Sequence, residues 1–435
     1  MTRRGFVRAS SAGLAVSVST PILVACSGPR EGAGEFDAEV ADAYAGLALE
    51  LIATTPGFSP PVASRVLGCM GVALYESVVP GMDGYRSLHA MLPGFPVTPL
   101  SPGSEYHWPT VANHALATIL MRLFPSDAPN LGQVAALQES FDVGVDVPRA
   151  VRSRSVERGV TVAEMVSLWA MSDGGHQGYL HNFPANYVIP QGQGLWEPTP
   201  PGFQEIPLQP HWGANRPFVD AGCSVPPPPS YSVDTNSDFF GYAAEVHETG
   251  TSLTPAEQEV ALFWADDPGT ITPAGHSVSM LRQVLAAEKA SLKIAAEAYL
   301  RVGCAIADSF IQCWDVKYTW NLVRPVTSIR ANLDSEWSPL VSTPPFPEYS
   351  SGHSTQSGAW AEVMTSLFGD GYQFTDHTHD DMGLSPRTFS SFQDAAEEAA
   401  VSRLYGGIHY RFSNDNGLEA GRCVGRSAAK LSLRV

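Results

Sequence analysis

Charge is scarce in this sequence of 435 residues, and one sign dominates. Only 16% of the residues are charged, against about a quarter in an average soluble domain. The 44 acidic residues outnumber the 26 basic ones, which gives a net charge of −18. A surface this acidic repels nucleic acid and anionic lipid, so we expect no nucleic-acid partner. The sum averages over the whole chain and therefore leaves room for a small basic pocket.

Cysteine and several familiar motifs are also scarce. The six cysteines form no C-x-x-C pair and no C-x-x-C-H motif, so neither a disulfide framework nor a c-type haem is expected. Most of the five that follow Cys26 should be small buried residues, and the sequence does not say which two could form a bridge. The chain has no G-x-S-x-G, H-E-x-x-H or Walker A motif, which argues against the enzyme classes built on them.

No apolar run is expected to reach the length of a membrane span. The apolar stretch 9–25 follows Arg3-Arg4, a pair that resembles a twin-arginine export signal, and ends in a lipobox-like Leu-Val-Ala-Cys at Cys26. We therefore predict that residues 1–26 are a signal that directs export by the twin-arginine route to the periplasm or cell surface. Cys26 is expected to carry a lipid anchor. An ordinary cleaved signal with an incidental cysteine is the alternative.

Apolar residues recur at helical spacing through most of the remaining chain. The pattern predicts helices over 37–54, 61–79, 106–124, 131–142, 161–172, 255–266, 276–303, 305–323, 354–368 and 389–405, and a last one ending near 430. Capping boxes are expected at Thr161–Glu164 and at Thr254–Glu257.

The segment 173–235 differs, because it is crowded with proline, glycine and aromatic residues. Its aromatic side chains favour burial, so we interpret it as a long loop wrapped around the fold. The prediction is an all-α fold of packed helical bundles, with an N-terminal half over 27–235 and a catalytic half over 236–435.

Two cations mark the first candidate block. Lys317, one of only four lysines, is followed seven residues later by Arg324, and two helical turns would place both on one face. Pro325 should end the helix at Arg324. Solvated cations on an exposed face are the alternative, but aromatic neighbours such as Trp314 favour a buried helix.

The second block places Ser351, Gly352 and His353 just before a helix, whose free N–H groups could bind an anion. A plain serine cap beside a surface histidine is the alternative. In the third block, Gly406-Gly407 separates Arg403 from His409 and would let both turn into one site. A glycine cap after a surface helix is the alternative there.

Together the three blocks predict a receptor for a tetrahedral oxyanion. Three cations around one centre would repel each other in a buried pocket unless an anion filled it. The receptor would combine cations, neutral donors and two acid–base or nucleophilic histidines: Lys317, Arg324, Arg403, Ser351, Gly352, His353 and His409. A fourth stretch, residues 376–381, could hold a divalent metal ion, but a solvated acidic loop is the favoured interpretation.

The motifs Lys-x6-Arg-Pro, Ser-Gly-His and Ser-Arg-x5-His, in this order, resemble those of the superfamily of vanadium-dependent haloperoxidases and type 2 phosphatidic-acid phosphatases. The resemblance is clear over about 255–435, and a softer likeness to the soluble bacterial haloperoxidases covers 60–65 and 196–201. It implies that vanadate or phosphate oxygens are bound by Lys317, Arg324, Ser351, Gly352 and Arg403.

The resemblance also implies roles for single residues. His409 would be the axial ligand to vanadium, or the nucleophile on phosphorus, and His353 the acid–base residue. Trp314 and Phe346 would line the site, and Asp267 would pair with Arg403. The chain departs from the family pattern twice: Ser350 stands where proline is usual, and Ser413 stands where an aspartate often supports the last histidine.

One pocket could serve two chemistries, because vanadate and phosphate share shape and charge. We favour the haloperoxidase, with hydrogen peroxide and halide as reactants, because the body is expected to be soluble and to carry a long N-terminal helical half. Phe346 in place of histidine is compatible with a chloroperoxidase or a phosphatase and argues mildly against a bromoperoxidase. The alternatives are an acid phosphatase that cleaves a phosphate ester through phosphohistidine, and a lipid-anchored protein that binds an oxyanion without turnover.

Overall fold

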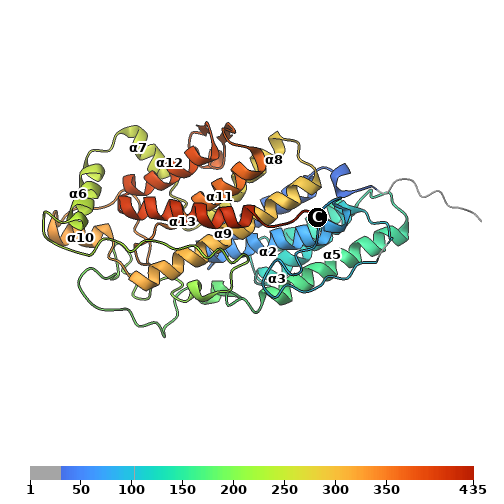
Figure 1. The fold of residues 1–435 in the computed structure, drawn as a ribbon, viewed down its shortest axis with the longest axis horizontal. Helices are drawn as coiled ribbons and strands as arrows, with labels where there is room; N and C mark the ends of the chain where they lie inside the picture. The colour runs from blue at the N-terminus through green and yellow to red at the C-terminus, as the bar shows by residue number, and fades with distance from the viewer. Residues whose placement is uncertain (1–30, 102) are drawn as a thin grey trace, which may run out of the picture. The chain divides into compact units, whose positions relative to one another are not determined.

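Helices dominate the computed structural model, which describes residues 31–101 and 103–435 (Figure 1). The predicted export signal, with Arg3, Arg4 and Cys26, lies outside the described residues. The helices are α1 Glu39–Thr54, α2 Pro60–Val78, α3 Trp108–Leu123, α4 Gly132–Asp142, α5 Arg149–Ala170, α6 Asp238–Thr251, α7 Pro255–Phe263, α8 Thr272–Ala287, α9 Leu292–Trp320, α10 Pro325–Asn332, α11 Gly352–Phe368, α12 Phe392–Tyr405 and α13 Arg411–Ala429. The predicted all-α class is confirmed.

The described strands are limited to one short hairpin. Strands β1 (Phe374–Asp376) and β2 (Arg387–Phe389) pair antiparallel, with Phe374 opposite Phe389. Phe374 packs on the buried Trp360 and Phe392. Phe389 packs on Phe374 and on the buried Trp264. The hairpin therefore closes one side of the bundle around α11 and α12. The sequence pattern predicted no strand because three-residue strands give too short an alternation to recognise.

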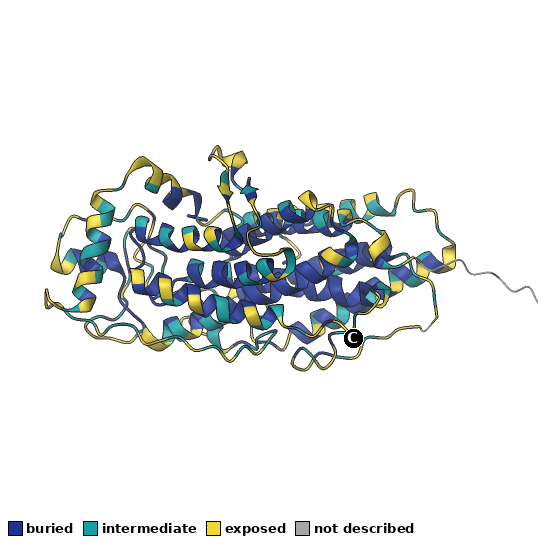
Figure 2. Cartoon of the chain, turned by 45° about the horizontal axis from the view of Figure 1, so that its top comes forward, coloured by how far each residue is buried: buried dark blue, intermediate teal, exposed yellow. Residues whose placement is uncertain are grey.

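The core is built around α2 and α9, which pack closely on one another. Figure 2 shows the buried residues gathered in the central helices. A side chain at Gly71 would collide with the backbone of Tyr299, and one at Gly303 would collide with that of Leu67. Helices α11 and α13 pack on one another and on α9. Helices from both predicted halves thus share one core.

The expectation that no apolar run approaches the length of a membrane span is wrong for the helix that runs from Pro60 to Gly81. It is long and apolar enough to cross a membrane, yet its whole apolar window is buried inside the fold. Its apolar surface is covered by neighbouring helices rather than available to lipid. We therefore assign it to the core.

Helix boundaries confirm some predictions and correct others. At Thr254 the capping box is present, with Glu257 N–H donating to Thr254 Oγ1 (3.3 Å) and Thr254 N–H donating to Glu257 Oε2 (2.8 Å). The box predicted at Thr161 is wrong, because α5 begins at Arg149 and Thr161 lies inside it. The break predicted near residue 304 falls instead at 288–291, before Ser291 caps α9. Helices α6 and α10 were not predicted.

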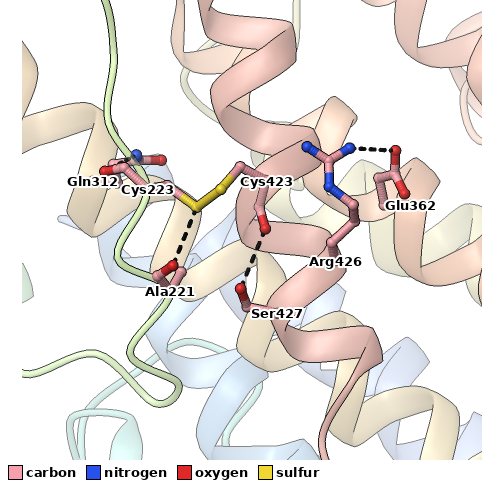
Figure 3. The surroundings of a disulfide bond; sticks show 7 residues. All are labelled: Ala221, Cys223, Gln312, Glu362, Cys423, Arg426 and Ser427. Carbon is pink, nitrogen blue, oxygen red and sulfur yellow. Dashed lines mark hydrogen bonds and ion pairs between the residues drawn. A yellow bond between two sulfur atoms is a disulfide. The ribbon is translucent and has the colours of Figure 1, made fainter.

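The segment 173–235 is a wrapped loop, as predicted, with only short 3-10 turns at Gly178–Leu180 and Trp212–Ala214. It buries Trp196, Trp212 and Phe218. A disulfide between Cys223 and Cys423 fastens the loop to α13 across 200 residues of sequence (Figure 3). The remaining cysteines of the described chain, Cys69, Cys304 and Cys313, are buried and free.

Candidate functional site

The three predicted blocks meet at one end of α9, α11 and α12. Lys317 lies in the last turn of α9, which ends at Trp320, and Asn321 then adopts a left-handed conformation (φ 46°). The sequence predicted that Arg324 would share one face of a helix with Lys317. Arg324 instead lies outside α9, at the N-cap of α10. The chain reverses between the two cations, and both side chains still reach the same buried region.

The second and third blocks take the predicted local form. Ser351 is the N-cap of α11 and accepts a hydrogen bond from Ser354 N–H (3.4 Å), while Gly352 is the first helical residue. Helix α12 ends just after Arg403, and Gly407 takes a positive φ of 77°. This turn directs the chain back, so that His409 and Arg403 line one cavity of about 550 Å³ together with Gly352 and His353.

All three cations are buried, at 0–2% exposure. Lys317 Nζ donates to the carbonyls of Pro347 (3.0 Å), Glu348 (2.8 Å) and Ser350 (2.6 Å), which occupies its three protons. Burial lowers the pKa of Lys317 to about 8 and the pKa values of both Arg324 and Arg403 to about 10. Lys317 therefore brings charge to the site, and a direct bond to an anion would replace one of its carbonyl bonds.

The two arginines keep unused donors. Arg324 donates from Nε to Phe346 O (2.8 Å) and from Nη1 to Ile408 O (2.9 Å), and its buried Nη2 has no partner among the described residues. Arg403 donates from Nη1 to Trp264 O (2.5 Å), and its buried Nε has none either. Buried donors without partners are costly, so these groups indicate a site for an acceptor-rich anion.

Two aromatic side chains form a wall beside the cations, as predicted. The ring of Phe346 lies 5.0 Å from Lys317 Nζ and 4.9 Å from Arg324 Cζ, within cation–π range. Trp314 packs on Phe346 with ring centroids 5.1 Å apart, and its Nε1–H donates to Leu208 O (3.2 Å). The wall therefore keeps water from one side of the cations.

His409 has a carboxylate partner that the sequence did not reveal. Its Nδ1–H donates to Glu348 Oε1 (2.7 Å), and Arg324 Nη1 donates to its Nε2 (3.3 Å). Burial and the charges of Arg324 and Lys317 hold the pKa of His409 well below its usual value, so the ring is neutral. Ser413 Oγ stands 3.5 Å from the same Nδ1. Glu348 thus takes the place expected of an aspartate at position 413 and keeps the proton off Nε2. A ligand or an electrophile could then replace Arg324 as the partner of the Nε2 lone pair.

His353 lines the same cavity as His409. Burial and the charge of Arg403 lower its pKa to about 4, so it is neutral near pH 7. Its Nε2 stands 3.7 Å from Asp266 Oδ2 and has no hydrogen-bond partner among the described residues. A neutral imidazole with a free nitrogen can accept a proton from a reactant or return one to it.

Asp267 does not hold the position expected for it. It is exposed and forms no ion pair with Arg403 among the described residues, although its charge raises the pKa of that arginine. The buried carboxylate is that of its neighbour Asp266, whose charge also acts on Arg403. The neighbouring pair Asp266-Asp267 indicated in the sequence that a carboxylate lies near Arg403. Only the backbone turn after α7 decides which of the two side chains points inward.

The loop 376–381 also differs from its prediction. Asp376 and His379 are buried, whereas His377, Asp380 and Asp381 are exposed, so the favoured solvated acidic loop is wrong for two of its members. His276 joins them from α8. Nothing in the local sequence links His276 to this loop, because its partner Asp376 lies 100 residues away along the chain.

The chain is similar to several known proteins. A family model described as the VCPO second helical-bundle domain matches residues 297–435. The structure of a bacterial vanadium-dependent iodoperoxidase is 34% identical, with a TM-score of 0.82, over 91% of this chain and 96% of that one. A bacterial vanadium-dependent chloroperoxidase shares the fold, with a TM-score of 0.70 and 16% identity over 87% of this chain and 93% of that one. A vanadium-dependent bromoperoxidase of Ascophyllum nodosum is 36% identical over 94 residues, which span 19% of this chain and 17% of the length of that protein.

Proposed function

Because this chain belongs to the family of vanadium-dependent haloperoxidases, which are enzymes, we propose that it binds vanadate beside His409 and uses hydrogen peroxide to oxidise halide. The observation that carries the proposal is the neutral His409, whose unprotonated Nε2 lies 3.3 Å from Arg324 Nη1 in a pocket where buried arginine N–H groups have no partner among the described residues. This combination offers one lone pair to a metal and several donors to its oxygens.

The residues present fit vanadate. Arg324 and Arg403 would bind its oxygens through the donors that have no partner, and Lys317 would add charge. Ser351 and Gly352 would contribute a hydroxyl and the free N–H of a helix N-terminus. His409 would supply the protein ligand to vanadium. Vanadate, when bound, would act as a Lewis acid that activates hydrogen peroxide for oxygen transfer to halide.

The side chains prepare the site for this chemistry. Glu348 holds the proton of His409 at Nδ1 and so keeps Nε2 unprotonated. His353 would accept a proton from the incoming peroxide and return it to the leaving hydroxide, which departs as water, because its pKa of about 4 keeps its free nitrogen unprotonated near pH 7. Trp314 and Phe346 exclude water from the cation side, which strengthens each charge interaction.

We also propose that the protein is exported before it acts. The Cys223–Cys423 disulfide supports this, since such bonds persist in oxidising compartments and are rare in the cytosol. The twin arginine at Arg3-Arg4 and the lipobox-like end at Cys26 would supply the route and the anchor. Mass spectrometry of the protein from a native-like host should find a diacylated N-terminal cysteine. An N-terminus at any other residue would contradict the anchor.

One paired assay tests the activity. Purified protein is incubated with vanadate, hydrogen peroxide and either bromide, chloride or iodide, and halogenation of a dye is followed. Hydrolysis of p-nitrophenyl phosphate is measured in parallel without vanadate. We expect halogenation that requires vanadate and is lost in His409→Ala. Hydrolysis without halogenation would favour the phosphatase, and neither activity would favour a binding protein.

A further inference from the structure

A second polar cluster lies behind the oxyanion cavity, and the proposed function does not use most of it. We propose that Asp266, His276 and His379 form a binding site for a divalent transition-metal ion, with Zn²⁺ as the ion that fits best. One ligand atom from each residue lies within 4.8 Å of the other two, and all three residues are buried. The residues come from the turn after α7, from α8 and from the loop after β1, so only the fold brings them together.

The distances fit a tetrahedral metal ion. His276 Nδ1 is 3.1 Å from Asp266 Oδ2, and His379 Nε2 is 3.2 Å from Asp266 Oδ1. Ligand atoms bound to zinc at about 2.0–2.2 Å in tetrahedral geometry are separated by roughly 3.3–3.6 Å. Small rotations of the side chains would therefore complete the site. Two imidazoles and one carboxylate are a donor set suited to zinc and to other late divalent metals.

His276 is held in the orientation that a metal ligand needs. Its Nε2 makes a 2.7 Å hydrogen bond with Asp376 Oδ2, and the other oxygen of Asp376 accepts from Thr378 N–H (2.9 Å). A carboxylate behind a histidine favours the proton on the far nitrogen and leaves the near one, here Nδ1, free to bind metal. Trp264 stacks on the His276 ring at 4.7 Å and fixes its plane.

His379 supplies the independent sign of a missing ligand. The side chain is 4% exposed, and its Nε2 has no hydrogen-bond partner among the described residues. Although Asp266 Oδ1 is near, the contact lacks hydrogen-bond geometry, so this buried polar atom stays unsatisfied. A metal ion between the two would satisfy both atoms.

The charges of the cluster also suit a divalent cation. The carboxylates of Asp266 and Asp376 are at most 1% exposed, and buried anions require compensation. A divalent ion between Asp266 and the two histidines would balance both carboxylates. Asp266 lines the oxyanion cavity, which gives an ion a path inward.

The test uses the full protein, freed of metal with a chelator, free of vanadate, and titrated with Zn²⁺ in a calorimeter. We expect one tight site per chain. His379→Gln and His276→Gln should weaken binding at least 100-fold. His377→Gln is the matched control, because His377 is exposed two residues away and its side chain pairs only with Asp380 among the described residues. His409→Ala should bind zinc normally, which separates this site from the vanadate site.

X-ray absorption of the zinc-loaded wild type gives a readout that does not depend on variants folding. We expect a four-coordinate shell containing two imidazoles. The proposal is overturned if the wild type takes up no zinc, if the shell contains oxygen alone, or if His377→Gln rather than His379→Gln loses the site.

Discussion

Glu348 is the residue whose replacement probes the oxyanion site most selectively. Glu348→Gln keeps the shape of the side chain but removes the carboxylate that accepts from His409 Nδ1 at 2.7 Å. Burial raises the pKa of Glu348 to about 7, although Lys317 and Arg324 oppose the rise. A hydrogen bond to a charged group contributes about 1.5–3 kcal/mol. Outer carboxylates of metal-bound histidines are worth about 10–100-fold in affinity or activity. The two ranges agree, so we expect vanadate affinity to fall about 10–100-fold.

The assay is a vanadate titration of the metal-free protein, followed by halogenation at saturating peroxide and halide. Glu245→Gln is the control, because Glu245 makes a surface ion pair with Arg411 and lies outside the site. Adding Ser413→Asp to Glu348→Gln should restore part of the affinity, since Ser413 Oγ lies 3.5 Å from His409 Nδ1. Unchanged affinity in Glu348→Gln, with the fold intact by circular dichroism, would refute the role assigned to Glu348.

Three further predictions concern the cavity, the disulfide and a buried acid. A Cβ at Gly352 would meet only ordinary contact with Trp314 (3.7 Å), so Gly352→Ala should fold normally. Its methyl group would enter the cavity and weaken vanadate binding about tenfold or more, measured by the same titration; equal affinity would contradict the placement. Cys423→Ser removes the Cys223–Cys423 disulfide, which joins residues 200 positions apart, and should lower the free energy of unfolding in urea by up to about 5 kcal/mol. A reductant should then have no further effect on the stability of this variant. Burial raises the pKa of Asp308 to about 8, so the folded state keeps a proton that the unfolded state releases near pH 4. Stability should therefore fall as pH rises between about 4 and 8, by up to about 1.4 kcal/mol per unit, and an equal slope in Asp308→Asn would contradict this.

Residues next to one another in sequence were the ones that sequence reasoning placed well. Ser351 and Gly352 are positioned by the start of a single helix, and Arg403 and His409 by one glycine turn, so local rules predict both arrangements. Lys317 and Arg324 were predicted to meet for the wrong reason. They converge because the chain reverses at Asn321 rather than because one helix carries both.

Residues brought together by tertiary packing were missed. Glu348 faces His409 across 61 residues, and His276 faces Asp376 across 100, so no local pattern marks either pair. One helix boundary was predicted wrongly for the same reason. Thr161 has the sequence of a cap, but the packing of α5 against α3 extends the helix past it towards Arg149. Tertiary contacts override capping propensity where burial provides more free energy than a cap.

Anomalous diffraction at the vanadium edge, from crystals grown with vanadate, tests the central claim most directly. We predict one vanadium peak in the cavity, within bonding distance of His409 Nε2 and between Arg324 and Arg403, and its loss in His409→Ala. A cavity without vanadium at saturating vanadate, or vanadium bound only elsewhere on the protein, would contradict the account.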